Sequence, residues 1–438
     1  MNKNIKLAVA GAILATASVA NAGIILPAGE WTVDIGGNVN AYSQWYKNNS
    51  GNSATVTSSA GVEVNTTKST QYGNGNGLLP NFLSVSGSTR QNDLDVAFTI
   101  SIQPGSSVRN PLETGPSGND SGGLASTGGI NNRQSFMTFG DKSWGSVKLG
   151  KDLGIFASDA ILSDMTLLGV GASKAGSGNT SLGRIGWGYL YADWKSMMAY
   201  TTPNFNGFQA TVGITSPFNT LNTMANTAAG LNSTTTTASG NSASPAYEGK
   251  ASYSFAANDV TGKLWVSGIS QRVNSFKVAN NASAVGNEDT VAYAGDIGAT
   301  VNVAGFGLTG YYYSGSGIGT TGQFMDGFGV KSAGVLESRD SDGGYIQATY
   351  VLPTKTKIGA SWGVSNLDRA SGENTLTTAA VGSSGNLVKE NSLWTIGVYH
   401  PLTKHLNLVA EWNNSRSENQ AGQENKANSG NLGAILFF

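Results

Sequence analysis

The chain has 438 residues, with 26 Lys and Arg, 27 Asp and Glu and a formal net charge of -1, so nothing in its charge favours nucleic acid as a partner. It contains no cysteine, which excludes a disulfide framework and thiolate chemistry. Only 12% of the residues are charged and 39% are hydrophobic, yet 9% are aromatic, unlike a disordered chain and typical of a protein with an apolar exterior and a wet interior.

The first 22 residues have the pattern of a cleavable signal peptide. Lys3 and Lys6 precede an apolar run over residues 7–17, and Ala20-Asn-Ala22 forms a small-x-small cleavage site. Neither this run nor any later one is long enough to span a bilayer as a helix. We expect a signal peptide at 1–22 and an exported domain at 23–438, which crosses a membrane as strands or, alternatively, is a soluble periplasmic protein.

Apolar and polar residues alternate with a period of two along the exported domain. Near the start, Val33 and Ile35 alternate with Thr32 and Asp34. Such a pattern predicts strands with one face toward lipid and the other toward water. It recurs in sixteen segments, near 31–45, 81–90, 92–103, 133–140, 145–151, 187–201, 207–215, 246–256, 260–271, 290–303, 305–314, 343–352, 355–366, 391–400, 404–414 and 429–438.

The links between these segments alternate between short and long. Short links such as Pro353-Thr354 alternate with long ones near 46–80, 104–132, 152–186, 216–245, 272–289, 315–342, 367–390 and 415–428. This order fits a barrel whose two termini lie on the periplasmic side, whereas a β-sandwich would not require it. We predict an all-β fold, a 16-stranded antiparallel transmembrane β-barrel with long extracellular loops and short periplasmic turns.

The last predicted strand supports the same architecture. Leu432, Ala434, Leu436 and Phe438 place apolar groups on one face of it. An apolar strand with a free edge promotes aggregation in a soluble protein. A closed barrel in a membrane pairs that edge and offers the apolar face lipid to contact.

Four stretches also resemble a known family. They are 132–140 (NRQSFMTFG), 144–152 (WGSVKLGKD), 158–165 (SDAILSDM) and 199–208 (AYTTPNFNGF). In order and spacing they are similar to the fourth and fifth strands, the third loop and the following turn of the general diffusion porins of Gram-negative outer membranes. The resemblance in motif covers mainly residues 130–215.

The resemblance implies a function and partners. It implies an outer-membrane porin that forms a water-filled channel for passive diffusion of ions and small hydrophilic solutes. The third loop, 152–186, is expected to fold inward as a constriction. The barrel is expected to form a homotrimer surrounded by outer-membrane lipid and lipopolysaccharide. Phe438 is expected to act as an assembly signal, read by the outer-membrane assembly machinery through the C-terminal strand.

The resemblance assigns five residues to the pore constriction. Arg133 stands where the family places a wall arginine, Asp164 matches an acidic position of the third loop, and Asp159 precedes it. Strand parity puts Lys148 and Lys195 on the lumen side. Basic groups on a pore wall favour anions and acidic groups favour cations, so we expect these residues to influence ion choice.

Two departures from the family pattern predict a weaker field across the pore. The segment Leu167-Leu-Gly-Val-Gly171 lacks a second acidic group of the family's third loop. Ala199 stands where the family has an arginine, for which Lys195 and Arg184 are candidate substitutes.

The sequence gives no support for catalysis. Both histidines, His400 and His405, flank a predicted periplasmic turn, so a Ser-His-Asp triad at the extracellular rim would lack its base. No H-E-x-x-H or P-loop motif occurs. We expect no enzyme, no cofactor and no metal site.

Two alternative functions remain open from the sequence. A porin selective for one nutrient class would line its lumen with aromatic residues, for which Tyr311 and Tyr313 are candidates. For these two tyrosines, however, a place in the aromatic belt at the membrane interface is the better interpretation. A receptor or adhesin barrel would bind another surface through its long loops and would not conduct ions.

Overall fold

The computed structural model describes residues 23–49, 68–106, 130–172, 179–218, 220–221, 237–238, 244–273, 290–330, 336–371 and 387–438. The expected signal peptide at 1–22 lies outside these residues. The central parts of several predicted long loops lie outside them too.

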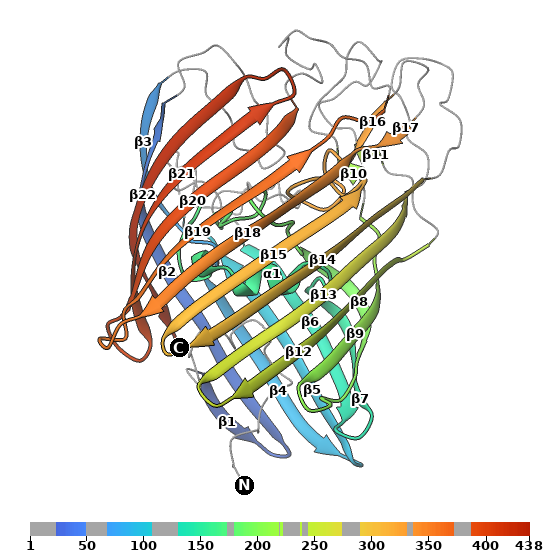
Figure 1. Cartoon of the computed structure of the whole chain (residues 1–438). Coiled ribbons are helices and arrows are strands. Elements are labelled where there is room, and N and C mark those ends of the chain that lie inside the picture. The colour runs from blue at the N-terminus through green and yellow to red at the C-terminus, as the bar shows by residue number, and fades with distance from the viewer. Residues whose placement is uncertain are drawn as a thin grey trace.

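The described strands close into one antiparallel ring (Figure 1). Each strand of the ring pairs with the next in chain order, and the last pairs with the first, where Phe437 lies opposite Asn38. The predicted barrel is confirmed, with sixteen strands among the described residues: β2 (Trp31–Asn48), β4 (Phe82–Gln91), β5 (Leu94–Pro104), β6 (Ile130–Asp141), β7 (Gly145–Leu153), β8 (Trp194–Thr201), β9 (Phe208–Thr215), β12 (Ala246–Ala257), β13 (Val260–Val273), β14 (Thr290–Val303), β15 (Phe306–Ser316), β18 (Asp340–Val351), β19 (Lys357–Leu367), β20 (Val388–Pro401), β21 (Leu406–Asn419) and β22 (Glu424–Phe437).

Two shorter strands complete the ring beside β2. On one side of β2, strand β1 (Ile24–Ala28) pairs with its first part and β22 pairs with its later part, so β1 and β22 lie end to end. On the other side, β4 pairs with the first part and β3 (Ser69–Gly75) with the later part. The last residue lies at this seam, because the N–H of Gly37 donates to an oxygen of Phe438 at 2.8 Å.

The alternating sequence produces an apolar outside and a polar inside. On β2, the side chain of Val39 points outward and is 56% exposed, whereas that of Asn38 points inward and is 1% exposed. A soluble protein would bury the valine and expose the asparagine. The inverted arrangement is stable where lipid surrounds the barrel.

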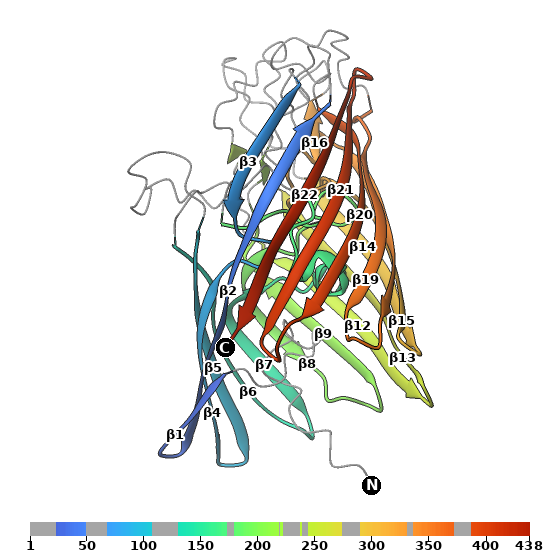
Figure 2. The ribbon, with the colours of Figure 1, turned by 90° about the vertical axis from the view of Figure 1, so that its left-hand side faces the viewer.

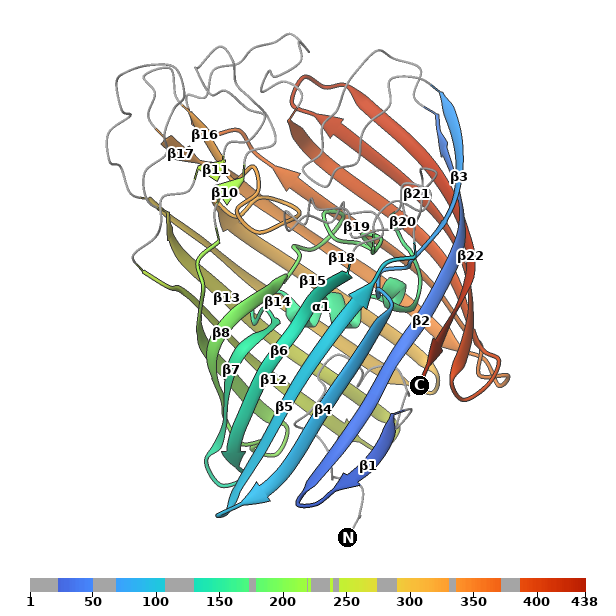
Figure 3. The same ribbon diagram turned by 180° about the vertical axis from the view of Figure 1, so that it is seen from behind.

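The short turns gather at one end of the barrel, the end where β1 lies (Figure 2). Asn92 and Asp93 form the two-residue turn between β4 and β5, and both have positive φ, 47° and 62°. Asn and Asp tolerate this left-handed conformation, which the tight hairpin turn between twisted strands requires. At the opposite end lie two small hairpins of the described residues, formed by β10 (Thr220–Leu221) with β11 (Thr237–Ala238) and β16 (Phe328–Val330) with β17 (Leu336–Ser338) (Figure 3).

The chain between β7 and β8 folds into the barrel, where it forms α1 (Ser158–Ser163) and the 3-10 helix η1 (Met165–Leu168) (Figures 2 and 3). No helix among the described residues is long and apolar enough to cross a membrane. The strand predicted at 187–201 is wrong in its first part, because β8 begins at Trp194. Residues 187–193 belong instead to the chain inside the barrel, and Asp193, directly before β8, has a left-handed φ of 58°.

Candidate functional site

The chain inside the barrel is held almost entirely out of solvent. We call it the inner loop, which comprises the described residues 154–172 and 179–193 between β7 and β8. From 154 to 192 the described side chains are buried, apart from Leu162, Ser163 and Leu168, which are partly exposed. Burial on this scale needs partners for the backbone N–H and C=O groups of the loop. The barrel wall supplies several of them.

The beginning of the inner loop is bound by a wall carboxylate on β12. Glu248 accepts the backbone N–H groups of Ile155 and Phe156 at 2.8 and 2.9 Å. The same carboxylate accepts the ammonium of Lys195 at 2.6 Å and the hydroxyl of Thr215 at 3.0 Å. Both charged side chains are 0% exposed. Lys195 therefore lies in a buried ion pair behind the loop rather than as an open charge on the lumen surface.

A second wall carboxylate, on β21, binds the middle of the inner loop. Glu411 accepts the N–H groups of Val170 and Gly171 at 2.9 and 2.8 Å and the hydroxyl of Tyr399 at 2.7 Å. A Cβ on Gly169 would lie 1.9 Å from the Glu411 carboxylate, so only glycine allows this close approach. The inner loop thus reaches from β12 to β21 and is fixed at both ends of that path.

Within the inner loop, the carboxylate of Asp159 forms ion pairs with two lysines of the barrel wall. Lys250 on β12 lies 3.2 Å from it, and Lys263 on β13 binds its other oxygen. Burial alone would raise the pKa of Asp159, but the two ammonium groups outweigh burial and hold the pKa below its ordinary value. Asp296 on β14 lies within electrostatic range of Asp159, so two ammonium groups face two carboxyl groups here, both of which are buried. No motif or spacing in the sequence links either lysine to Asp159, because the contacts span 91 and 104 residues.

Asp164 is buried and bound by hydroxyl and amide groups. It caps the N-terminus of η1, and its carboxylate accepts the backbone N–H and the hydroxyl of Thr166 at 2.9 and 2.7 Å. The hydroxyl of Tyr189, from the returning part of the inner loop, donates to it at 2.9 Å. This carboxylate links the two limbs of the inner loop and forms no ion pair with a described residue.

Arg133 and Lys148 lie on neighbouring strands, each with its own local partner. The Arg133 guanidinium lies over the ring of Trp194, 5.8 Å from its centroid. Lys148 forms an ion pair with Asp152 and lies 4.7 Å from the centroid of Phe136. The five residues singled out from the sequence therefore do not form one cluster, and their roles in the pore remain predictions.

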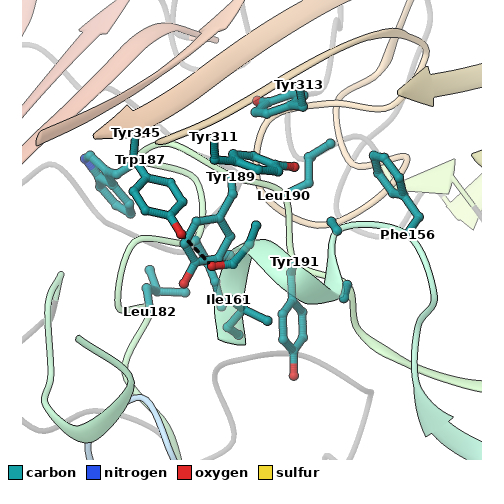
Figure 4. Close-up of a cluster of buried hydrophobic side chains, with 14 of the residues drawn as sticks. Phe156, Ile161, Leu182, Trp187, Tyr189, Leu190, Tyr191, Tyr311, Tyr313 and Tyr345 are labelled. Atoms are coloured by element: carbon teal, nitrogen blue, oxygen red, sulfur yellow. Dashed lines mark hydrogen bonds between the residues drawn. The ribbon is translucent and has the colours of Figure 1, made fainter. Parts of the chain in front are cut away.

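Tyrosines of the wall pack against the inner loop. Figure 4 shows Tyr189 of the loop near Tyr345 and Tyr311, with ring centroids 5.8 Å apart for Tyr189 and Tyr345 and 5.7 Å apart for Tyr311 and Tyr345. The expectation that Tyr311 and Tyr313 belong to the interface belt is wrong, because both are buried inside the barrel. Tyr312 between them is exposed on the outside. Tyrosines occupy both faces of β15, so residue type alone could not distinguish its lumen side from its lipid side.

Within the described parts of the chain, no three or more His, Cys, Asp or Glu side chains gather as a metal site would require.

The fold and the site define a class of protein. A closed barrel that is apolar outside and polar inside, with a folded loop bound to its inner wall, is a membrane channel of the outer-membrane barrel type. The sequence profile of the Gram-negative porins matches residues 8–420, and the chain belongs to this family. It is a porin of the bacterial outer membrane that forms a channel for passive diffusion of small solutes. Family and fold point to a channel rather than an enzyme.

Solved structures of outer-membrane proteins share the fold. The outer membrane channel DcaP of Acinetobacter baumannii aligns with a TM-score of 0.62 at 14% identity, covering 94% of this chain and 99% of that chain. The trimer form of in-vitro folded OmpT of Vibrio cholerae gives 0.52 at 14% identity, covering 93% and 99%. Salmonella typhi OmpF in complex with daunomycin gives 0.51 at 12% identity, covering 95% and 100%. A search of curated proteins by sequence found no match.

Proposed function

We propose that this porin is a water-filled channel that prefers small anions and that the inner loop is its constriction. The observation that carries the proposal is the unequal exposure of opposite charges. The side chain of Asp159 is 5% exposed, whereas those of its partners Lys250 and Lys263 are 23% and 37% exposed. A solute in the lumen would therefore meet mainly the ammonium groups.

The same inequality occurs at the ion pair between Lys148 and Asp152, whereas both partners of the pair between Lys195 and Glu248 are fully buried. Asp152 is buried, whereas Lys148, its partner, is partly exposed. Glu248 and Glu411 are both buried and accept hydrogen bonds from the inner loop. Charges on a narrow wall of low dielectric act strongly at short range, and salt screens them beyond about 8 Å at physiological ionic strength. The exposed lysines would raise the local concentration of anions.

The reversal potential in a potassium chloride gradient tests this proposal. We expect the wild-type channel to favour chloride and the double variant Lys250→Gln, Lys263→Gln to shift toward potassium. Lys389→Gln is the matched control, because Lys389 is exposed and pairs with Glu418 near the extracellular end of β20 and β21. A wild-type preference for potassium would contradict the proposal. A folded barrel without any conductance would instead favour a receptor or adhesin.

We also propose that three copies form a homotrimer in contact with outer-membrane lipid and lipopolysaccharide. The trimer form of OmpT, which shares this fold, supports this assembly. Migration of the unheated protein at three times the mass of the heated chain, confirmed by light scattering in detergent, would support a trimer. We further propose that the assembly machinery recognises the C-terminal strand ending at Phe438.

A further inference from the structure

A narrow cavity lies between the inner loop and the wall around β6. Its volume is about 40 Å³, and its lining includes Leu79, Pro80, Leu153, Leu162, Trp194 and Arg133. The lining is thus mostly apolar and contains one cationic side chain. A space of this size holds only a few water molecules, so a solute would enter it one group at a time.

Four of the lining side chains face open space. Leu153, Leu162, Trp194 and Arg133 are partly exposed, whereas the other lining side chains are buried or nearly so. Leu162 belongs to α1 of the inner loop, and the remaining three belong to the strands β6, β7 and β8. A solute at this position would therefore meet two aliphatic side chains, an indole and a guanidinium.

The Arg133 guanidinium has N–H donors that no described residue accepts. It lies over the Trp194 ring and, among the described residues, donates no hydrogen bond and forms no ion pair. The carboxylate of Asp193 is within electrostatic range of it but accepts the backbone N–H of Trp194 at 2.7 Å. A guanidinium offers five N–H donors in a planar fork that matches a carboxylate. The Trp194 ring lies beside this fork and offers its face to the cation.

We infer that the mouth of this cavity, where these four partly exposed side chains lie, binds monoanions that carry an apolar body, such as short fatty acids. The carboxylate pairs with Arg133, and the apolar body packs on Leu162, Leu153 and Trp194. This inference rests on the proposed channel function and names the class of solute that the same passage selects. A sugar is a poorer fit, because its hydroxyl groups would lose water against leucines without gaining partners.

Block of chloride current by a series of monoanions tests the inference. Acetate, butyrate and hexanoate carry the same charge and differ only in apolar length. Each buried methylene group strengthens binding by about three- to fourfold, so half-maximal block requires the lowest concentration with hexanoate. Arg133→Ala should raise that concentration about tenfold, because a charge-assisted pair is lost. Arg133→Lys should restore part of the affinity, since it keeps the charge but loses the planar fork.

Two further variants separate the parts of the site. Leu162→Asn should flatten the dependence of block on chain length, because the apolar body loses a leucine to pack on. Arg90→Ala is the matched control, because Arg90 lies on β4 and is already paired with Asp95 and Asp141. Heat-dependent electrophoretic mobility identifies variants that fold. If Arg133→Ala does not fold, Arg133→Lys and Leu162→Asn decide the outcome.

Several results would overturn the inference. One is equal block by acetate and hexanoate, and another is block of Arg133→Ala at the wild-type concentration. Either result would leave the proposed channel function standing if chloride still passes. A wild-type protein that conducts nothing would refute the channel function instead. Calorimetric titration of the detergent-solubilised protein with hexanoate would then test whether the site binds it, and absence of binding would refute the inference.

Discussion

The ammonium of Lys195 lies 2.6 Å from the carboxylate of Glu248, and both side chains are completely buried between β8, β12 and the inner loop. The Glu248 carboxylate also accepts the backbone N–H groups of Ile155 and Phe156, at the beginning of the inner loop. The pair thus connects the wall to the loop. Removing one of the two side chains would leave the charge of the other buried without a partner.

We expect Lys195→Met to lower the free energy of unfolding by about 3–5 kcal/mol, because Glu248 would remain buried and uncompensated. The double variant Lys195→Met, Glu248→Gln should recover most of this loss, since it removes both charges. Denaturant unfolding in detergent measures both. A single variant as stable as the wild type would show that the pair is not coupled to stability.

The close approach of Gly169 to Glu411 predicts an effect on the channel itself. Gly169→Ala places a Cβ against the carboxylate, so either the Glu411 side chain or the inner loop must shift, and the hydrogen bonds between them weaken. We expect larger fluctuations of single-channel current in this variant. Gly430→Ala is its control, because a Cβ on Gly430 would have no heavy atom within 4 Å. Equal current noise in both variants would contradict the anchoring role of Glu411.

The ion pairs of Asp159 predict a specific dependence on pH. Because Lys250 and Lys263 hold the pKa of Asp159 below its ordinary value of 3.8, the folded chain keeps this carboxylate charged to lower pH than the unfolded chain does. Its contribution to stability is therefore complete above that value and is lost as the pH falls through the lowered pKa. The free energies of unfolding of the wild type and of Asp159→Asn, compared between pH 7 and pH 2, measure this contribution. We expect the difference between them to be constant down to about pH 4 and to shrink below it. A difference that already disappears near pH 6 would contradict the assignment.

The seam of the barrel predicts the effect of shortening the last strand. Phe438 exchanges two backbone hydrogen bonds with Gly37, at 2.8 and 3.1 Å. Deleting Phe438 removes both bonds and opens the junction between β1 and β22, so we expect less folded protein in the membrane. Phe438→Leu keeps the backbone bonds and an apolar side chain. Normal yield of the deletion variant would refute the assembly role of Phe438 and show that these two bonds are not needed for folding, whereas a defect in Phe438→Leu would point to recognition of the aromatic ring.

The sequence by itself determined the barrel, its strands and the polarity of each face. Alternation is a local property, since neighbouring residues of any strand point to opposite sides, and Val33 and Thr32 already express it. Local pattern failed where both sides of a strand carry the same residue type, as at Tyr311 and Tyr312. It also failed where the chain inside the barrel leads into a strand, since β8 begins only at Trp194.

Only the tertiary structure decided which charges meet. Lys195 and Glu248 are 53 residues apart, and Lys250 and Lys263 lie 91 and 104 residues from Asp159. Their distances depend on closure of the ring and on the path of the inner loop along the wall. That path is fixed by hydrogen bonds between the loop backbone and carboxylates such as Glu411, which no local spacing encodes.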